Sequence, residues 1–535
     1  MERFLAWWRA EKRYIVLLKA VLMGFLPLVC CLVSCGIQGK SIGQVYLPMS
    51  EWNDELFYFK QVEGIVHYGY PQGYFGFNES HALKLSFAAW SPVLVFPWIV
   101  WGLLFGWNMM SPVICNIFLL SLAMALFVCL VRPTWKQLGV LTLLFCLYMP
   151  FVRYMLSGMP EIICFSLLIL FYGLAVNDIR RERGWKLFCL FLLSGLLTLM
   201  RPYFLLFMLL PAFLWVRKRG WRGVVGSCLT VAGVFGCYAM IKHYLGAEYF
   251  APLFFTDWIE AFLERGIGGG VIYTLSKLKS MGSAFWEHTQ RGFTEGLASG
   301  AFFGGYLTML AVLLWQSLTE LRKYLAQRRA AQAGQRPEAF AMLVTELHLT
   351  FCFVGMFFAL LLMYKLTEGS KHLLTFMAAG IFVISLMKTR FYKKAVVLGA
   401  VFAYLYSYKA VEPYDYQVPF WEEARYEQVE TWRQELQGEL ALADKEAPCF
   451  DNCVIWVLND WVEEGWRSTR WQLLYALPEG FGISCCEQSY VLEHLDTLES
   501  RYIAFPAGGS LEGLCARKGF REIYRDGDMA LYQRY

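Results

Sequence analysis

The chain has 535 residues, of which 57% are apolar and only 17% are charged. Soluble proteins are typically about 45–50% apolar and about 25% charged, so this composition excludes a disordered chain and an ordinary set of soluble domains. The net charge of +5 is the sum of +16 over residues 1–408 and −11 over residues 409–535. With a mean hydropathy of +0.42, the sequence predicts a polytopic α-helical membrane domain over 1–408 and a soluble α/β domain over 409–535.

Twelve apolar runs precede residue 409, and a membrane-spanning helix needs roughly 20 mostly apolar residues. A cleavable signal peptide is the alternative interpretation of the first run. The runs are Tyr14–Cys35, Phe87–Phe105, Val113–Val131, Gln137–Val152, Ile162–Val176, Leu187–Met200, Tyr203–Val216, Gly223–Ile241, Ala301–Leu314, Leu347–Tyr364, His372–Met387 and Lys394–Tyr408.

Basic residues in short loops mark the cytoplasmic side of a membrane. From Arg132 onward, two apolar runs separate each basic cluster from the next, so all these clusters can be cytoplasmic. Three runs lie between the basic N-terminus and Arg132, so one of them must not span. The run Phe87–Phe105 holds two prolines and three tryptophans, which suits an interfacial or re-entrant helix. We therefore expect 11 spans, a cytoplasmic N-terminus and an extracytoplasmic C-terminal domain.

The first expected outside loop, residues 36–112, combines carboxylates with aromatic rings. Asp54 and Glu55 form an acidic pair about 15 residues after the first span. A carboxylate can accept a proton from an acceptor hydroxyl, while rings stack on the face of a sugar. A solvated turn is the alternative. The aromatic and histidine candidates for acceptor or sugar binding in this loop are Trp52, Tyr58, His67 and His81.

Charged residues also occur at the expected outer ends of later spans. Glu161 begins one span, where it is either functional or a helix-dipole partner. Arg201 lies between two apolar runs of about 14 residues, roughly 21 Å of helix each, so it is expected below the outer membrane surface. A charge there is costly and indicates function, a phosphate being a natural ligand for its guanidinium; an intraprotein ion pair is the alternative. Lys371 and His372 start another outer-leaflet helix, where Lys371 can instead reach lipid headgroups.

Taken together, these features resemble the GT-C superfamily of integral-membrane glycosyltransferases, which includes protein O-mannosyltransferases and the lipid A aminoarabinose transferase. The resemblance covers roughly residues 1–410 by the order and spacing of short motifs. Those motifs are Asp54-Glu55 after the first span, Trp90-Ser91-Pro92, Glu161 in a short second loop, the Met200-Arg201-Pro202 turn and Glu368-Gly369-Ser370-Lys371-His372.

The resemblance implies a polyprenyl-phosphate-linked sugar donor and a catalytic cavity facing away from the cytoplasm. It assigns Asp54 as catalytic base with Glu55 as its neighbour, Glu161 to the acceptor site, and Arg201, Lys371 and His372 to the donor phosphate. Which of the two adjacent carboxylates is the base stays open. No metal is required, although Asp54 and Glu161 could ligate a divalent cation. The acceptor is a lipid, a glycan or a protein, and no nucleic-acid partner is expected.

The C-terminal segment has the pattern of strands and helices. An Asp-Gly turn indicates a terminal hairpin, and about 125 residues are enough for an independent core. Its cysteines have a spacing that only faintly suggests zinc, with a disulfide or free thiols as alternatives. The expected helices are Trp421–Leu442, Trp471–Ala476 and Leu511–Lys518, and the expected strands are Cys453–Leu458, Tyr502–Phe505, Glu522–Tyr524 and Met529–Tyr532.

Two other functions fit parts of this pattern. A transporter or flippase of lipid-linked saccharides would need polar residues inside the spans and often internal repeats, and the sequence shows little of either. A non-enzymatic scaffold or receptor would leave Asp54 dispensable. The long loop 242–300, which mixes aromatic residues and scattered charges, is expected to form helices at the outer interface beside the cavity.

Overall fold

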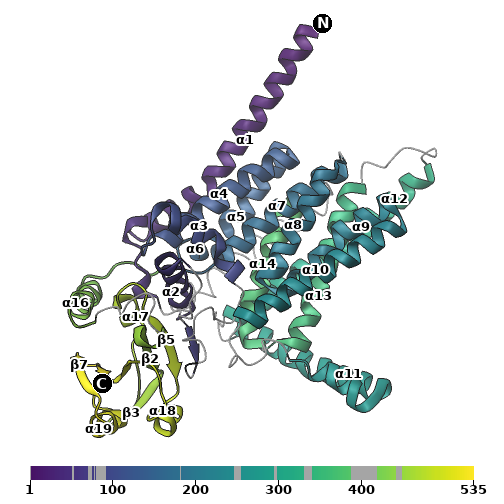
Figure 1. The fold of residues 1–535 in the computed structure, drawn as a ribbon. Helices are drawn as coiled ribbons and strands as arrows, with labels where there is room; N and C mark the ends of the chain where they lie inside the picture. Colours follow the sequence, from purple (N-terminus) through teal and green to yellow (C-terminus); the bar gives the residue numbers. More distant parts are fainter. Residues whose placement is uncertain are drawn as a thin grey trace.

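The computed structural model describes residues 2–50, 53–69, 75–77, 79, 92–180, 182–245, 255–294, 298–330, 340–364, 366–386, 418–440 and 449–534. A helical body and a smaller α/β domain make up this part of the chain (Figure 1). The helices of the body are α1 (Glu2–Ile37), α2 (Asn53–Tyr68), α3 (Phe96–Phe105), α4 (Ser111–Val131), α5 (Trp135–Leu147), α6 (Met149–Met155), α7 (Glu161–Arg180), α8 (Gly184–Met200), α9 (Leu209–Arg219), α10 (Trp221–Leu245), α11 (Asp257–Thr294), α12 (Ala298–Ala330), α13 (Phe340–Met363) and α14 (Leu366–Ser385).

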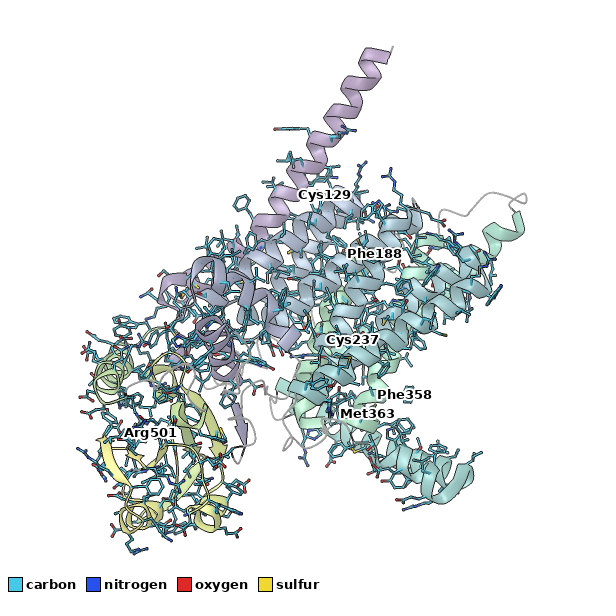
Figure 2. The ribbon with its side chains drawn as sticks, viewed as in Figure 1. Cys129, Phe188, Cys237, Phe358, Met363 and Arg501 are labelled. Atoms are coloured by element: carbon cyan, nitrogen blue, oxygen red, sulfur yellow. The ribbon has the colours of Figure 1, made fainter. Side chains whose placement is uncertain are left out.

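Five helices in the described residues are long and apolar enough to cross a membrane. They lie in α1, α4, α7, α10 and α13, and four shorter apolar helices accompany them. Apolar side chains such as Phe188 and Phe358, which are labelled in Figure 2, are 67% and 46% exposed. A lipid-facing surface explains this exposure, because water would penalise so many apolar side chains. The chain is thus a multi-pass membrane protein.

Several expected spans differ in detail from the helices observed. The run Gln137–Val152 is broken at Tyr148, where α5 ends and α6 begins with a proline in its first turn. A proline lacks the amide donor that would continue the preceding helix, so the expectation of one continuous span was wrong. The run Lys394–Tyr408 lies outside the described residues. The count of 11 spans and the orientation of the termini therefore stay predictions.

The segment expected not to span is short in the structure. A 3-10 turn, η3 (Pro92–Val95), leads into α3, which has ten residues. Ten residues give about 15 Å of helix, half the roughly 30 Å of a bilayer core. Gly102 lets α3 lie against α2, since a Cβ there would come within 2.8 Å of Val66. Residues 87–91 lie outside the described part.

The chain reverses at Arg201, as the sequence predicts. Helix α8 ends at Met200, the 3-10 segment η4 (Pro202–Met208) follows, and α9 continues to Arg219. Pro202 begins η4 and fixes the backbone angle there. Within the long loop 242–300, residues 257–294 form the kinked helix α11, which packs on α12 and α13; its bend is at Gly266, where φ is +67°.

The C-terminal domain is built on a six-stranded sheet in the order β1-β5-β2-β6-β8-β7. The expected elements are confirmed in α16 (Glu423–Glu439), β2 (Cys453–Val457), α17 (Leu473–Ala476), β6 (Tyr502–Pro506), α19 (Ser510–Arg517), β7 (Arg521–Arg525) and β8 (Met529–Gln533). The elements not foreseen are the hairpin β3 (Asn459–Val462) and β4 (Gly465–Ser468), strand β5 (Gly482–Cys486) and α18 (Gln488–His494). Cys485 and Cys515 are buried thiols.

The loop that follows α1 completes this domain. Strand β1 (Phe75–Phe77) pairs in parallel with β5 at the sheet edge. Phe57 and Phe59 of α2 share a buried cluster with Trp456 and Tyr475 of the domain. Backbone hydrogen bonds also run from the Tyr46 amide to the Pro419 carbonyl and from the Trp421 amide to the Gln44 carbonyl. The C-terminal segment therefore has one buried cluster of its own, which includes Ile455, Phe505 and Leu511, and a second buried cluster that it shares with the loop after α1.

Removal of residues 418–535 should prevent the remaining chain from folding stably. The deletion would expose Tyr46, Leu47, Phe57 and Phe59, which are each less than 10% exposed in the intact chain, and each fully buried large side chain contributes roughly 1.5–3 kcal/mol. Size-exclusion chromatography of the detergent-extracted truncation should show aggregates. A monodisperse truncated protein would contradict this role of the loop.

Candidate active site

Helix α2 carries two acidic residues that face different surroundings. Asp54 and Glu55 both lie in its first turn, where the positive end of the helix dipole favours carboxylates. Successive residues on a helix point about 100° apart, so the two side chains cannot share one environment. Asp54 is partly exposed, whereas Glu55 is fully buried.

Glu55 is held in a buried ion pair. Arg153 of α6 donates from Nη1 to Glu55 Oε1 at 3.2 Å, and both side chains are at most 3% exposed. Burial raises the pKa of Glu55, while Arg153 and hydrogen bonds from Ser50 and the Gly158 backbone oppose the rise. A Cβ at Gly158 would come within 3.1 Å of the Glu55 Cβ. Glu55 thus holds α2 against α6 and the turn that precedes α7.

Replacement of Arg153 by methionine should destabilise the protein by about 3–5 kcal/mol, because a buried charge loses its partner. The double variant Glu55→Leu/Arg153→Met should recover most of this loss, since neither charge remains. Thermal unfolding of the purified protein in detergent measures both effects. An unaltered stability of Arg153→Met would show that the pair does not hold α2 in place.

A second buried ion pair joins two of the predicted site residues. Arg201 Nη2 donates to Glu161 Oε1 at 2.5 Å, and both side chains are 1% exposed. Arg201 Nη1 also donates to the hydroxyl of Tyr203 at 3.1 Å. Residues from the start of α7 and from the α8–η4 turn are therefore fixed against each other. The ion pair within the protein, which was the alternative to a phosphate ligand for Arg201, is therefore present.

Two polar side chains hold the segments that present this pair. Asn116 of α4 donates to the carbonyls of Tyr154 in α6 and of Ser157 and Met159 in the turn before α7. His348 of α13 lies 3.3 Å from the Leu206 carbonyl of η4. Backbone carbonyls buried in a membrane protein need such partners. These contacts fix where Glu161 and Arg201 meet.

Ring contacts place His372 near the ion pair of Arg201 and Glu161. The His372 ring lies 5.4 Å from the ring of Tyr203 and 4.9 Å from that of Tyr364. His372 is 3% exposed, near the start of α14. The structure therefore brings His372 beside the Arg201–Tyr203 contact. Lys371 belongs to the same helix turn, but its side chain lies outside the described residues.

Tyr58 links Asp54 to the buried pair. Burial, Asp54 and Glu161 raise the pKa of Tyr58 well above its ordinary value, and Arg201 opposes the rise. The charges of Asp54, Glu161 and Arg201 therefore all act on the Tyr58 hydroxyl. Asp54 and Tyr58 are four residues apart and lie on one face of α2. Asp54, Tyr58, Glu161, Arg201 and His372 thus converge from four segments, and we call them the α2–α7 cluster.

The remaining predicted residues lie elsewhere. His67 is near the other end of α2, about 20 Å along the helix from Asp54, and faces Glu479 of the C-terminal domain at 4.0 Å. It is therefore not brought to the α2–α7 cluster. Trp52 and His81 lie outside the described residues. Within the described ranges, no three His, Cys, Asp or Glu side chains are grouped closely enough to hold a metal ion.

Sequence reasoning missed Arg153, Tyr203 and Asn116. Arg153 stood in a short outside loop, where a lone basic residue is unusual under the positive-inside rule, and this signal could have revealed its buried partner. Tyr203 lies two residues after Arg201 and could have been suspected from that spacing. Asn116 sits in an apolar span, where polar residues generally have a specific partner.

No protein-family model and no curated protein matches the chain. Among solved structures, the Archaeoglobus fulgidus oligosaccharyltransferase in the apo form is 12% identical with a TM-score of 0.45, over 92% of this chain and 69% of that one. ArnT from Cupriavidus metallidurans, bound to undecaprenyl phosphate, is 11% identical with a TM-score of 0.43, over 96% and 97%. Both are GT-C membrane glycosyltransferases. The likeness concerns the overall fold and assigns no residue.

Proposed function

We propose that the chain is a membrane glycosyltransferase that transfers a sugar from a polyprenyl-phosphate-linked donor to an extracytoplasmic acceptor. The observation that carries the proposal is the α2–α7 cluster. It gathers a partly exposed carboxylate, a buried carboxylate and a buried guanidinium from segments far apart in the sequence. Charges buried in a membrane protein are costly and are retained for function.

Asp54 is the catalytic base in this proposal. It accepts the proton of an acceptor hydroxyl, whose oxygen attacks the anomeric carbon of the donor sugar. The bond from that carbon to the phosphate oxygen breaks, and the electron pair leaves with the polyprenyl phosphate. The partial exposure of Asp54 supports this role, because the base must reach an acceptor. Glu55 is an unsuitable base, since it is fully buried and paired with Arg153.

Arg201 supplies positive charge to the phosphate that is released. A fixed cation stabilises negative charge as it develops on the leaving group, and a guanidinium suits a phosphate. Glu161 and Tyr203 hold the guanidinium in place, and His372 and Lys371 are proposed to complete the phosphate site. This scheme requires no metal ion, although Asp54 and Glu161 could ligate a divalent cation.

The C-terminal domain is proposed to shape the acceptor side of the site. It packs directly on α2, which carries Asp54, through Phe57, Phe59 and Trp456. The proposed topology places this domain and the cluster on the extracytoplasmic side of the cytoplasmic membrane. Trp52, Tyr58, His67 and His81 remain proposals for contacts with the sugar or acceptor.

A direct test incubates the purified protein with a labelled polyprenyl-phosphate sugar and a membrane extract that contains acceptors. We expect label to move from the lipid fraction to a product in the presence of the unaltered protein. The alternative function, transport of a lipid-linked saccharide, predicts movement of intact donor across vesicles without transfer. Movement of intact donor with no product would contradict the enzyme proposal.

A further inference from the structure

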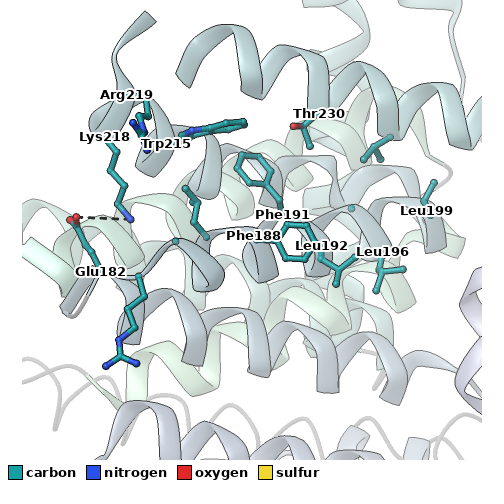
Figure 3. Close-up of a pocket in the computed structure, with 15 residues that line it drawn as sticks. Glu182, Phe188, Phe191, Leu192, Leu196, Leu199, Trp215, Lys218, Arg219 and Thr230 are labelled. Atoms are coloured by element: carbon teal, nitrogen blue, oxygen red, sulfur yellow. Dashed lines mark ion pairs between the residues drawn. The ribbon is translucent and has the colours of Figure 1, made fainter. Parts of the chain in front are cut away.

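A lateral cavity of about 760 Å³ opens between α8, α9 and α10 (Figure 3). Its lining on α8 runs from Gly184 to Leu199, and Arg201 directly follows the last residue of this helix. One wall is an apolar face of α8, in which residues recur at helical spacing. The members of this face are Leu187, Phe188, Phe191, Leu192, Leu196 and Leu199.

The length of the apolar wall matches one leaflet of a membrane. Leu187 and Leu199 are twelve residues apart on a helix, which corresponds to about 18 Å. The hydrocarbon core of a bilayer is about 30 Å thick, so one leaflet contributes about 15 Å. A single lipid chain inserted from one side would therefore run along the whole wall.

Charge is confined to one end of this cavity. Lys218 and Arg219 lie there together with Glu182 (Figure 3), and Arg183, the neighbour of Glu182 in the chain, also lines the cavity. Lys218 is paired with Asp178 at 3.5 Å and with Glu182 at 4.0 Å. In the described part of the chain, the guanidiniums of Arg183 and Arg219 have no ion pair. The positive-inside rule assigns this basic end to the cytoplasmic side.

Small residues keep the cavity open. Gly195 lies on its floor, and a Cβ there would already be 3.4 Å from Val234 of α10. Trp215 of α9 rests on Gly226, where any Cβ would come within 2.4 Å of the indole ring. Helix α10 is largely exposed, because only 6% of the residues in its most apolar 18-residue segment are buried. The gap between α8 and α10 is thus accessible from the bilayer.

We propose that this cavity binds one anionic phospholipid of the cytoplasmic leaflet. An acyl chain lies along the apolar face of α8, and the headgroup phosphate lies between Arg183 and Arg219. Basic pockets between helices on the cytoplasmic side suit anionic headgroups, and guanidiniums bind phosphate through charge-assisted hydrogen bonds. The proposed sugar donor is a different lipid, because its phosphate belongs at Arg201, beyond the opposite end of the apolar face.

The test is a titration of the purified full-length protein in detergent with fluorescent phosphatidylglycerol. The variant Arg183→Ala/Arg219→Ala should bind it about 30-fold more weakly. Arg222→Ala is the matched control, because Arg222 is also exposed in the same basic segment but does not line the cavity. Its affinity should stay within about twofold of the unaltered protein.

A second variant tests the chain rather than the headgroup. Gly195→Leu would extend into the cavity and should prevent binding although both arginines remain. Circular dichroism and thermal unfolding verify that each variant is folded. Equal affinity for phosphatidylcholine, unchanged binding by the two variants, or displacement of the probe by polyprenyl phosphate more readily than by phosphatidylglycerol would each overturn the proposal.

Discussion

Replacement of Asp54 by asparagine is expected to lower the rate of sugar transfer by about 10²–10⁴-fold, the range that a general base contributes. Asparagine keeps the size of the side chain and its place on α2, but it cannot accept the acceptor proton. Because Asp54 is partly exposed and asparagine has nearly the same size, the variant should remain folded. The measurement is the initial rate of label transfer from a polyprenyl-phosphate sugar.

The control for Asp54→Asn is the same chemical change at Asp496. That carboxylate is 70% exposed in the C-terminal domain and pairs only with Lys518 among the described residues, so its loss should alter stability by less than about 1 kcal/mol. Asp496→Asn should retain full transfer activity. Full activity of Asp54→Asn, in a folded protein, would remove the catalytic base from the proposal and favour a scaffold or transporter.

Local patterns predicted much of this fold. The run Val113–Val131 and the observed α4, Ser111–Val131, differ by only two residues, because lipid demands a continuous apolar segment with internal backbone bonding. Strands β2 and β6 were found from short buried apolar runs. The reversal at Arg201 followed from the length of the run and the charges at its ends. Each of these signals lies within one segment of sequence.

Contacts between distant segments could not be predicted. Strand β1 joins β5 across roughly 400 residues, and no local pattern in the first outside loop marks that pairing. The roles of Asp54 and Glu55 were likewise left open, because they depend on which face of α2 meets Arg153. Glu161, Arg201 and His372 were found as single charged residues in a membrane context, yet their convergence came from the packing of α7, η4 and α14.

Arg201 has two roles that a pair of variants can separate. Arg201→Met leaves Glu161 charged and buried, so it should lower stability by about 3–5 kcal/mol. The loss of activity in this variant would therefore be ambiguous. The double variant Glu161→Gln/Arg201→Met removes both charges and should recover most of the stability, because the uncompensated carboxylate is gone. Thermal unfolding in detergent measures the recovery.

The transfer rate of the double variant then reports what Arg201 contributes to the reaction, separately from its contribution to stability. If Arg201 stabilises the departing phosphate, transfer should stay about 10²–10³-fold below that of the unaltered protein, although the fold is restored. Glu161→Gln alone supplies the reference, since it keeps the guanidinium, and its side-chain oxygen can still accept the hydrogen bond from Arg201 Nη2; the rates are compared at a temperature where thermal unfolding shows both variants to be folded. If Arg201 serves only as the partner of Glu161, the double variant should transfer sugar as fast as Glu161→Gln. Equal rates for these two variants would assign Arg201 to structure and move the phosphate site to other residues.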